Sequence, residues 1–114
     1  MPSETRPGTD AAVNRWNATS ESSLNEIFRV CAARVRRETL VVLRTEDDPI
    51  SLTELATELS DDTEQVRLSL VHIHLPMLDA AGLVRWNPKR DSVALDAIPS
   101  RYRRLIDVID REMR

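Results

Sequence analysis

Residues 74–84, His-Leu-Pro-Met-Leu-Asp-Ala-Ala-Gly-Leu-Val, contain the change of periodicity that decides the fold. Hydrophobic residues before Gly82 recur at helical spacing, and those after it stand in short runs that are typical of strands. Glycine is common just after the end of a helix, so Gly82 indicates where this helix ends. We predict a helix from about residue 63 to residue 81, and Pro76 should kink it or interrupt its hydrogen bonding.

The segment after Gly82 predicts a β-hairpin followed by a helix. Residues 83–86 and 92–95 read as two short strands, and the Asn-Pro-Lys-Arg-Asp link between them favours a turn with a basic tip. A last helix is expected from about Ser100, because hydrophobic residues recur there at helical spacing. Its inward positions are Tyr102, Leu105, Ile106, Ile109 and Met113.

Helical periodicity also begins at Leu24 and places Cys31 on a hydrophobic face, where we expect a small core residue and not a nucleophile. The hydrophobic face continues to Leu43. An arginine group within residues 34–37 marks either a break between two helices or the solvated surface of one long helix.

A short strand and a short helix are expected next. Ile50 follows a charged turn and is a candidate for a very short strand. Ser51 and Glu54 have the spacing of a capping box, in which each side chain accepts a hydrogen bond from the other residue's backbone N–H. The box predicts the start of a helix that presents leucines inward as far as Leu59.

This order of elements predicts a mainly α-helical fold with a small β-hairpin wing. We divide the chain into a flexible N-terminal tail (residues 1–20), a winged helix-turn-helix domain (21–98) and a C-terminal helix (99–114). Residues 74–84 resemble the HLxxLxxAGLV signature that closes the recognition helix and opens the wing in ArsR-type regulators. The nearest resemblance is to small winged-helix domains of uncharacterised function from haloarchaea.

The resemblance covers about residues 24–95 and implies a winged helix-turn-helix fold and DNA binding. One departure is that the stretch from Leu59 to Leu75 is several residues longer than the compact ArsR turn. Metal-sensing members of that superfamily use clustered Cys or Cys/His ligands, whereas this chain has Cys31 alone. We therefore expect neither a metal site nor a cofactor.

The predicted helix over residues 63–81 has a polar stripe suited to reading DNA bases. Gln65, Ser69 and His72 lie along it; glutamine can pair with adenine, and serine and histidine can donate or accept at base edges. Candidates for phosphate contacts, which add affinity without reading sequence, are Arg85, Lys89, Arg90, Arg36 and Arg37. The alternative is that these residues form an ordinary solvated surface.

The two histidines are not expected to share a metal ion. His72 and His74 lie about 200° apart on a helix, and His74 falls in the hydrophobic arc. We expect His74 to be a hydrogen-bonded core or interface residue. Arg67 points away from the polar stripe and is expected to pair with an acid or to lie at a partner surface.

The net charge of −3 argues weakly against nucleic acid as a partner. The acids are concentrated, however: residues 46–66 hold eight of them and no base. All basic residues except Lys89 are arginine, a bias that suggests a GC-rich genome and, with the acids, a halophile. In roughly 1 M salt the Debye length is about 3 Å, so acids near a duplex would be strongly screened.

We therefore predict a sequence-specific transcriptional regulator that binds double-stranded DNA as a homodimer, probed through the last helix together with the first. The alternative is a protein-interaction or dimerisation module with little DNA contact and a protein partner. No catalytic constellation stands out, so an enzyme is not expected. No membrane-spanning run or secretory signal is seen, which favours the cytoplasm.

Overall fold

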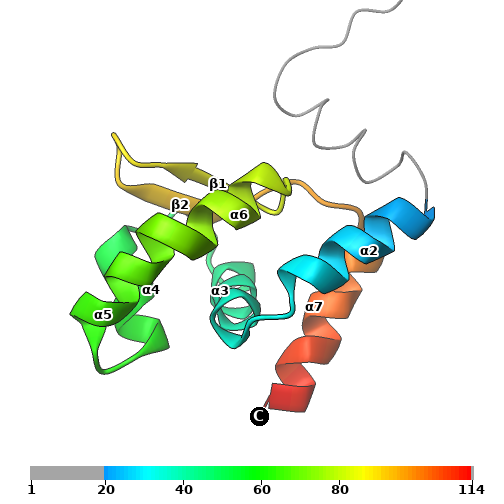
Figure 1. Cartoon of the computed structure of the whole chain (residues 1–114), viewed down its shortest axis with the longest axis horizontal. Helices are drawn as coiled ribbons and strands as arrows, with labels where there is room; N and C mark the ends of the chain where they lie inside the picture. The colour runs from blue at the N-terminus through cyan, green and yellow to red at the C-terminus, as the bar shows by residue number, and fades with distance from the viewer. Residues whose placement is uncertain (1–19, 114) are drawn as a thin grey trace, which may run out of the picture.

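Helix α3 (Arg34–Arg44) lies at the centre of the fold, where it packs against α4 (Leu52–Leu59), strand β2 (Ser92–Leu95) and the C-terminal helix α7 (Ser100–Met113). The computed structural model describes residues 20–113 (Figure 1). The other elements are α2 (Ser20–Val30), α5 (Thr63–Ser69), the π-helical turn η1 (Leu70–His74), α6 (Leu75–Ala80) and β1 (Val84–Asn87). The predicted mainly α-helical fold with a hairpin wing is confirmed.

One hydrophobic core gathers side chains from the helices and from both strands. Its fully buried members include Ile27, Leu40, Leu55, Leu70, Leu75, Leu78, Val84, Val93 and Ile106. Burying a leucine or isoleucine side chain contributes roughly 1.5–3 kcal/mol. Because Ile27 of α2 and Ile106 of α7 belong to this core, both outer helices pack as part of the same domain.

The wing is an antiparallel hairpin in which Val84 pairs with Leu95 and Asn87 pairs with Ser92. Ile50 adds a bridge on the other side of β2: its N–H donates to Val93 O over 2.9 Å, and Val93 N–H donates to Ile50 O over 2.8 Å. The expected very short strand at Ile50 is thus present as a single bridge. This bridge fixes the hairpin against the start of α4.

Two predicted helix ends are confirmed by their hydrogen bonds. Ser51 Oγ accepts from Glu54 N–H, and Glu54 Oε1 accepts from Ser51 N–H, so the capping box begins α4. After α6, Leu83 N–H donates to Leu78 O and Gly82 has a φ of 80°. This backbone arrangement is a Schellman motif, and its positive φ favours glycine.

A break separates α2 from α3, which decides between the two alternatives left by the arginine group. Arg36 Nε donates to Val30 O over 2.6 Å, and Arg37 Nη1 donates to Cys31 O over 2.7 Å. Both guanidinium groups therefore stabilise carbonyls at the C-terminal end of α2. Cys31 packs half-buried against the core, and this burial raises the pKa of its thiol although both arginines favour the thiolate.

The long helical stretch from Thr63 to Ala80 is interrupted by the π turn. Leu75 N–H donates to Leu70 O, a bond that spans five residues and not the usual four. Pro76 follows at once and has no N–H with which to continue the α-helical ladder. The predicted interruption at Pro76 therefore takes the form of a π turn.

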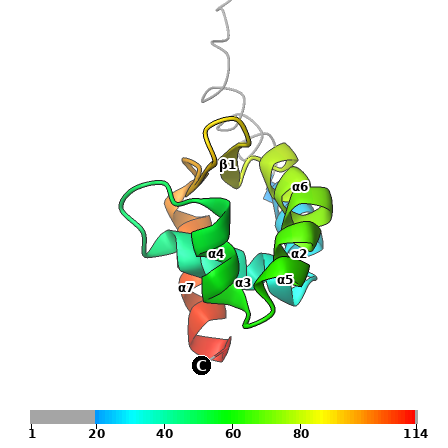
Figure 2. The same ribbon diagram turned by 90° about the vertical axis from the view of Figure 1, so that its left-hand side faces the viewer.

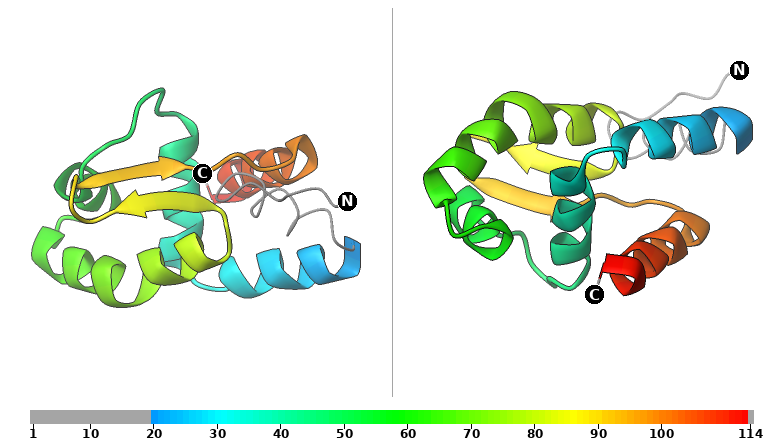
Figure 3. Two further views of the ribbon diagram at one scale, coloured as in Figure 1. Left: turned by 90° about the horizontal axis from the view of Figure 1, so that it is seen from above. Right: turned by 60° about the horizontal axis from the view of Figure 1, so that its bottom comes forward.

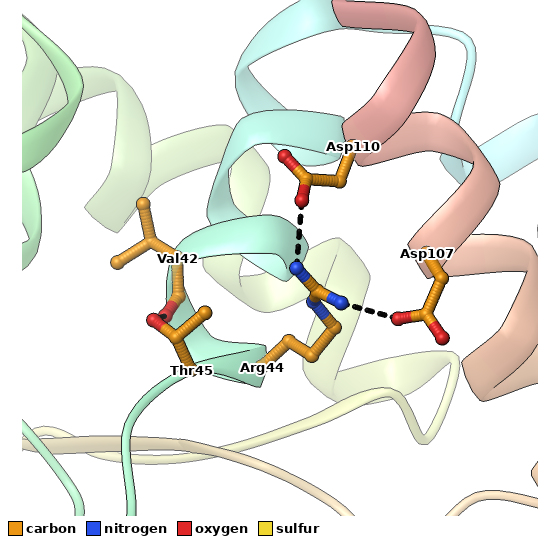
Figure 4. Close-up of polar contacts among 5 residues, drawn as sticks. All are labelled: Val42, Arg44, Thr45, Asp107 and Asp110. Atoms are coloured by element: carbon orange, nitrogen blue, oxygen red, sulfur yellow. Dashed lines mark hydrogen bonds and ion pairs between the residues drawn. The ribbon is translucent and has the colours of Figure 1, made fainter. Parts of the chain in front are cut away.

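The C-terminal helix docks on α3 through Arg44, which corrects part of the predicted dimer interface (Figure 4). Arg44 Nη1 donates to Asp107 Oδ1, and Arg44 Nη2 donates to Asp110 Oδ2 over 2.7 Å. Tyr102 and Ile106 are buried in the domain's own core and are not free for a second copy. The remaining candidates, Leu105, Ile109 and Met113, are half-buried.

The predicted N-terminal tail, residues 1–20, lies outside the described residues except for Ser20, the first residue of α2. Within residues 20–113, none of the helices combines the length and the hydrophobicity needed to cross a membrane.

Candidate nucleic-acid interface

The outward face of α5–η1–α6 carries two of the three predicted base-contact residues. Gln65 and His72 are exposed, as predicted. Ser69 is half-buried, and its hydroxyl donates to Val66 O over 3.1 Å. Ser69 is therefore turned partly inward and is the weakest of the three candidates.

Two hydrophobic side chains share this face. Leu68 is 51% exposed and Ile73 is 53% exposed. The prediction that Ile73 belongs to the buried arc is wrong, because a π turn holds more residues per turn than an α-helix. Residues after Leu70 are consequently rotated back from the regular helical positions, and Ile73 turns outward.

The same turn directs His74 inward, where it meets Arg36 of α3. Arg36 Nη1 lies 3.2 Å from His74 Nδ1; arginine can only donate, so His74 accepts with its neutral ring. Burial and then the charge of Arg36 lower the pKa of His74. The expectation of a hydrogen-bonded core or interface histidine is confirmed.

Arg36 does not belong with the phosphate-contact candidates. It is 8% exposed, and its guanidinium joins the end of α2 to the π turn through Val30 O and His74. Arg37 is half-buried, and Nη1 is engaged by Cys31 O. The sequence placed both arginines near the end of a helix, but their tertiary partners lie six or more residues away.

The hairpin tip presents the two strongest phosphate-contact candidates. Lys89 and Arg90 are exposed, and among the described residues neither side chain has an ion pair or hydrogen bond. Their backbone N–H groups both donate to Asn87 Oδ1, over 3.1 and 3.2 Å. Asp91 completes the turn with a φ of 53°. The tip is thus held by its backbone while both cations stay free.

Two carboxylates fix the hairpin relative to the helices. Asp79 Oδ2 accepts from Trp86 N–H over 3.2 Å, which joins α6 to β1. Asp91 Oδ1 accepts from Leu52 N–H over 2.9 Å, which joins the tip to the first turn of α4. In Figure 3 the hairpin consequently runs back alongside α5 and α6. Neither contact was predicted from the sequence.

Arg85 lies on the outer face of β1, with its side chain 70% exposed and its Nε 3.8 Å from Asp96 Oδ1. It lines one shallow pocket with Arg90 and a second with the acidic loop before α4, residues 46–48. Arg85 is therefore placed beside the wing cations but also faces carboxylates.

The acidic block divides between two places. The loop with residues 46–48 lies near α7 and β2, on the opposite side of the molecule from α5–α6 (Figure 2). Asp61, Asp62 and Glu64 lie instead at the start of α5, next to Gln65. Part of the block is thus turned away from the candidate interface, and part flanks it.

The acids at the start of α5 have local partners. Asp62 Oδ1 accepts from Gln65 N–H over 3.3 Å and caps the helix. Glu64 Oε1 lies 3.7 Å from Arg67 Nη1, so the expectation that Arg67 pairs with an acid is confirmed. Within the described residues, no group of three His, Cys, Asp or Glu side chains is placed to hold a metal ion.

Comparison with protein families matches residues 28–94 to a domain of unknown function, DUF7344. The matched range runs from α2 to β2, and so includes the π turn and the wing but not α7. Comparison with curated proteins and with solved structures finds no match. Because the family match spans more than half of the chain, the protein belongs to the DUF7344 family.

Proposed function

We propose that this protein is a sequence-specific DNA-binding regulator of transcription that acts in the cytoplasm. Helix α5–η1–α6 enters the major groove, and the hairpin contacts the flanking phosphates. The observation that carries the proposal is the placement of two unpaired cations, Lys89 and Arg90, on a wing that is hydrogen-bonded to the candidate reading helix. The proposal extends the resemblance to ArsR-type regulators and involves no catalytic step.

The wing is preorganised for this role. Asp79 and Asp91 hold it through backbone N–H groups, so the positions of its cations relative to the reading helix are set before binding. A rigid contact surface loses less conformational entropy when it binds. Phosphate contacts from such a wing position the helix without reading sequence.

The acids near Gln65 oppose the proposal only in part. Asp62 is committed to the helix cap, and Glu64 lies near Arg67, so neither is an isolated charge. At the salt concentrations of a halophile their repulsion would extend only about 3 Å. The acidic loop before α4 lies on the side away from the proposed interface.

We also propose a homodimer, now centred on the side chains that α2 and α7 leave exposed. Phe28 of α2 is 61% exposed and Val108 of α7 is 41% exposed. Leu105, Ile109 and Met113 remain candidates at its edge. Tyr102 and Ile106 are replaced in this role because they fill the core of their own domain.

A protein-interaction module is the second candidate function. It is favoured by the exposed Phe28, which has no role in the DNA proposal, and by the three acids at the start of α5. Such a module would bind a protein partner through α2 or α5 and would have little contact with DNA.

Fluorescence anisotropy separates the two functions. Labelled duplexes with a random central sequence are titrated with folded protein at two salt concentrations, and bound sequences are selected and read. The DNA proposal expects binding that weakens with salt and a recurring motif among the selected sequences. A folded protein that binds no duplex at either salt would favour the protein-interaction module.

A further inference from the structure

The proposed reading face is unusually rich in exposed hydrophobic side chains. Leu68 and Ile73, each about half-exposed, lie on the outward face that also carries Gln65 and His72. In the described part of the chain, the other large hydrophobic side chains with this much exposure are Phe28 and Val108, on α2 and α7. The two leucine and isoleucine side chains therefore belong to the proposed interface and not to a general scatter.

The same helix lacks the group that most often reads guanine. Arginine or lysine donating to guanine O6 and N7 is the commonest specific base contact. Between residues 63 and 80 the single such residue is Arg67, whose Nη1 lies 3.7 Å from Glu64 and whose Nε is buried. Gln65 is free for the adenine edge instead.

Thymine presents a hydrophobic group in the major groove, its C5-methyl. We infer that the α5–η1–α6 helix recognises A·T base pairs, with Leu68 and Ile73 packing against thymine methyl groups. This inference rests on the proposed function and names the class of sequence that the site selects.

The spacing of the two side chains fits this target. Five residues separate Leu68 from Ile73, which is about 7 Å along a helix and about two base-pair steps along one strand. The π turn is needed for this geometry, because it brings Ile73 onto the face of Gln65. The two contacted thymines should accordingly lie about two steps apart.

The test compares duplexes that differ in the methyl group alone. Sequences selected from a random-core pool are prepared with thymine or with uracil, and dissociation constants are measured by anisotropy for each. We expect selected sequences to be rich in A·T pairs. Uracil should weaken binding about fourfold for each contacted methyl, from roughly 0.8 kcal/mol for a buried group of this size.

Variants assign the effect to the two side chains. Leu68→Ala and Ile73→Ala should each lower the thymine-to-uracil preference about fourfold. Phe28→Ala and Val108→Ala are matched controls, since they also truncate exposed hydrophobic residues, and they should leave the preference unchanged.

Equal affinity for thymine and uracil duplexes would overturn the inference while leaving the proposed function intact. A preference for thymine that survives both Leu68→Ala and Ile73→Ala would overturn the assignment of the methyl contacts to these residues. A folded protein that binds neither duplex would overturn the proposed function, and the inference with it.

Discussion

Neutralising the wing tip should weaken DNA binding without changing its sequence preference. Lys89→Gln with Arg90→Gln removes two cations whose side chains have no partner among the described residues. The turn itself should persist, because Asn87 Oδ1 accepts from the backbone N–H groups of both positions. Any change in binding then reports lost contacts to phosphate.

The expected size follows from the number of cations removed. Each neutralised phosphate contributes about 0.9 to the slope of log affinity against log salt concentration on duplex DNA. Two lost contacts should therefore make the slope shallower by about 1.8. Between about 50 mM and 200 mM salt, the unmodified protein should lose roughly twelvefold more affinity than the variant loses.

Anisotropy titrations across this salt range measure both slopes. Arg104→Gln with Arg111→Gln is a matched control, because it changes the net charge equally at exposed positions of α7, away from the wing. If the wing variant keeps the original slope, the tip does not contact phosphate. If the control flattens the slope as much as the wing variant does, the effect comes from overall charge and the proposed interface is wrong.

Three further predictions concern the packing that positions this interface. Arg44→Gln should lower the free energy of unfolding by about 2 kcal/mol, measured by urea denaturation, because it removes charged hydrogen bonds that hold α7 on α3. An unchanged unfolding midpoint would mean that α7 docks without this contact. Ile106→Ala should cost about 2–5 kcal/mol by the same assay at every protein concentration, since Ile106 fills the domain's own core; a cost that vanished on dilution would point to a dimer interface instead. Because the pKa of His74 is lowered in the folded protein, the unfolded chain binds more protons below its ordinary value of 6.5, and stability should fall as the pH drops through that value. His74→Gln should reduce this pH dependence, and an identical dependence in the variant would exclude His74 as its source.

Most of the fold is local enough to be predicted from the sequence. The capping box at Ser51, the helix end at Gly82 and the hairpin all depend on residues within a few positions of each other. The prediction was wrong for Ile73, where it assumed uniform helical spacing. A signal was present: Leu70 and Leu75 are five residues apart and Pro76 follows them, a combination that a regular helix does not accommodate.

The sites that escaped prediction depend on contacts between distant segments. Arg36 was a candidate for phosphate binding, yet its partners are Val30 O and the ring of His74, which is 38 residues away. Likewise, the hydrophobic face of α7 predicted a dimer, but Tyr102 and Ile106 use that face inside the domain. Hydrophobic periodicity identifies which face is buried and does not identify what covers it.

The π turn connects the packing of the helix to its proposed role. Leu70 and Leu75 are both fully buried, although residues five apart in a regular α-helix point about 140° from each other. A regular helix would therefore force one of these leucines out of the core, at a cost of about 2–5 kcal/mol if the cost resembles that of truncating it. Keeping both leucines buried requires the π turn, and the π turn in its place directs His74 to Arg36 and Ile73 to the outward face. The side chains offered to DNA are thus selected by the core on the opposite side of the same helix.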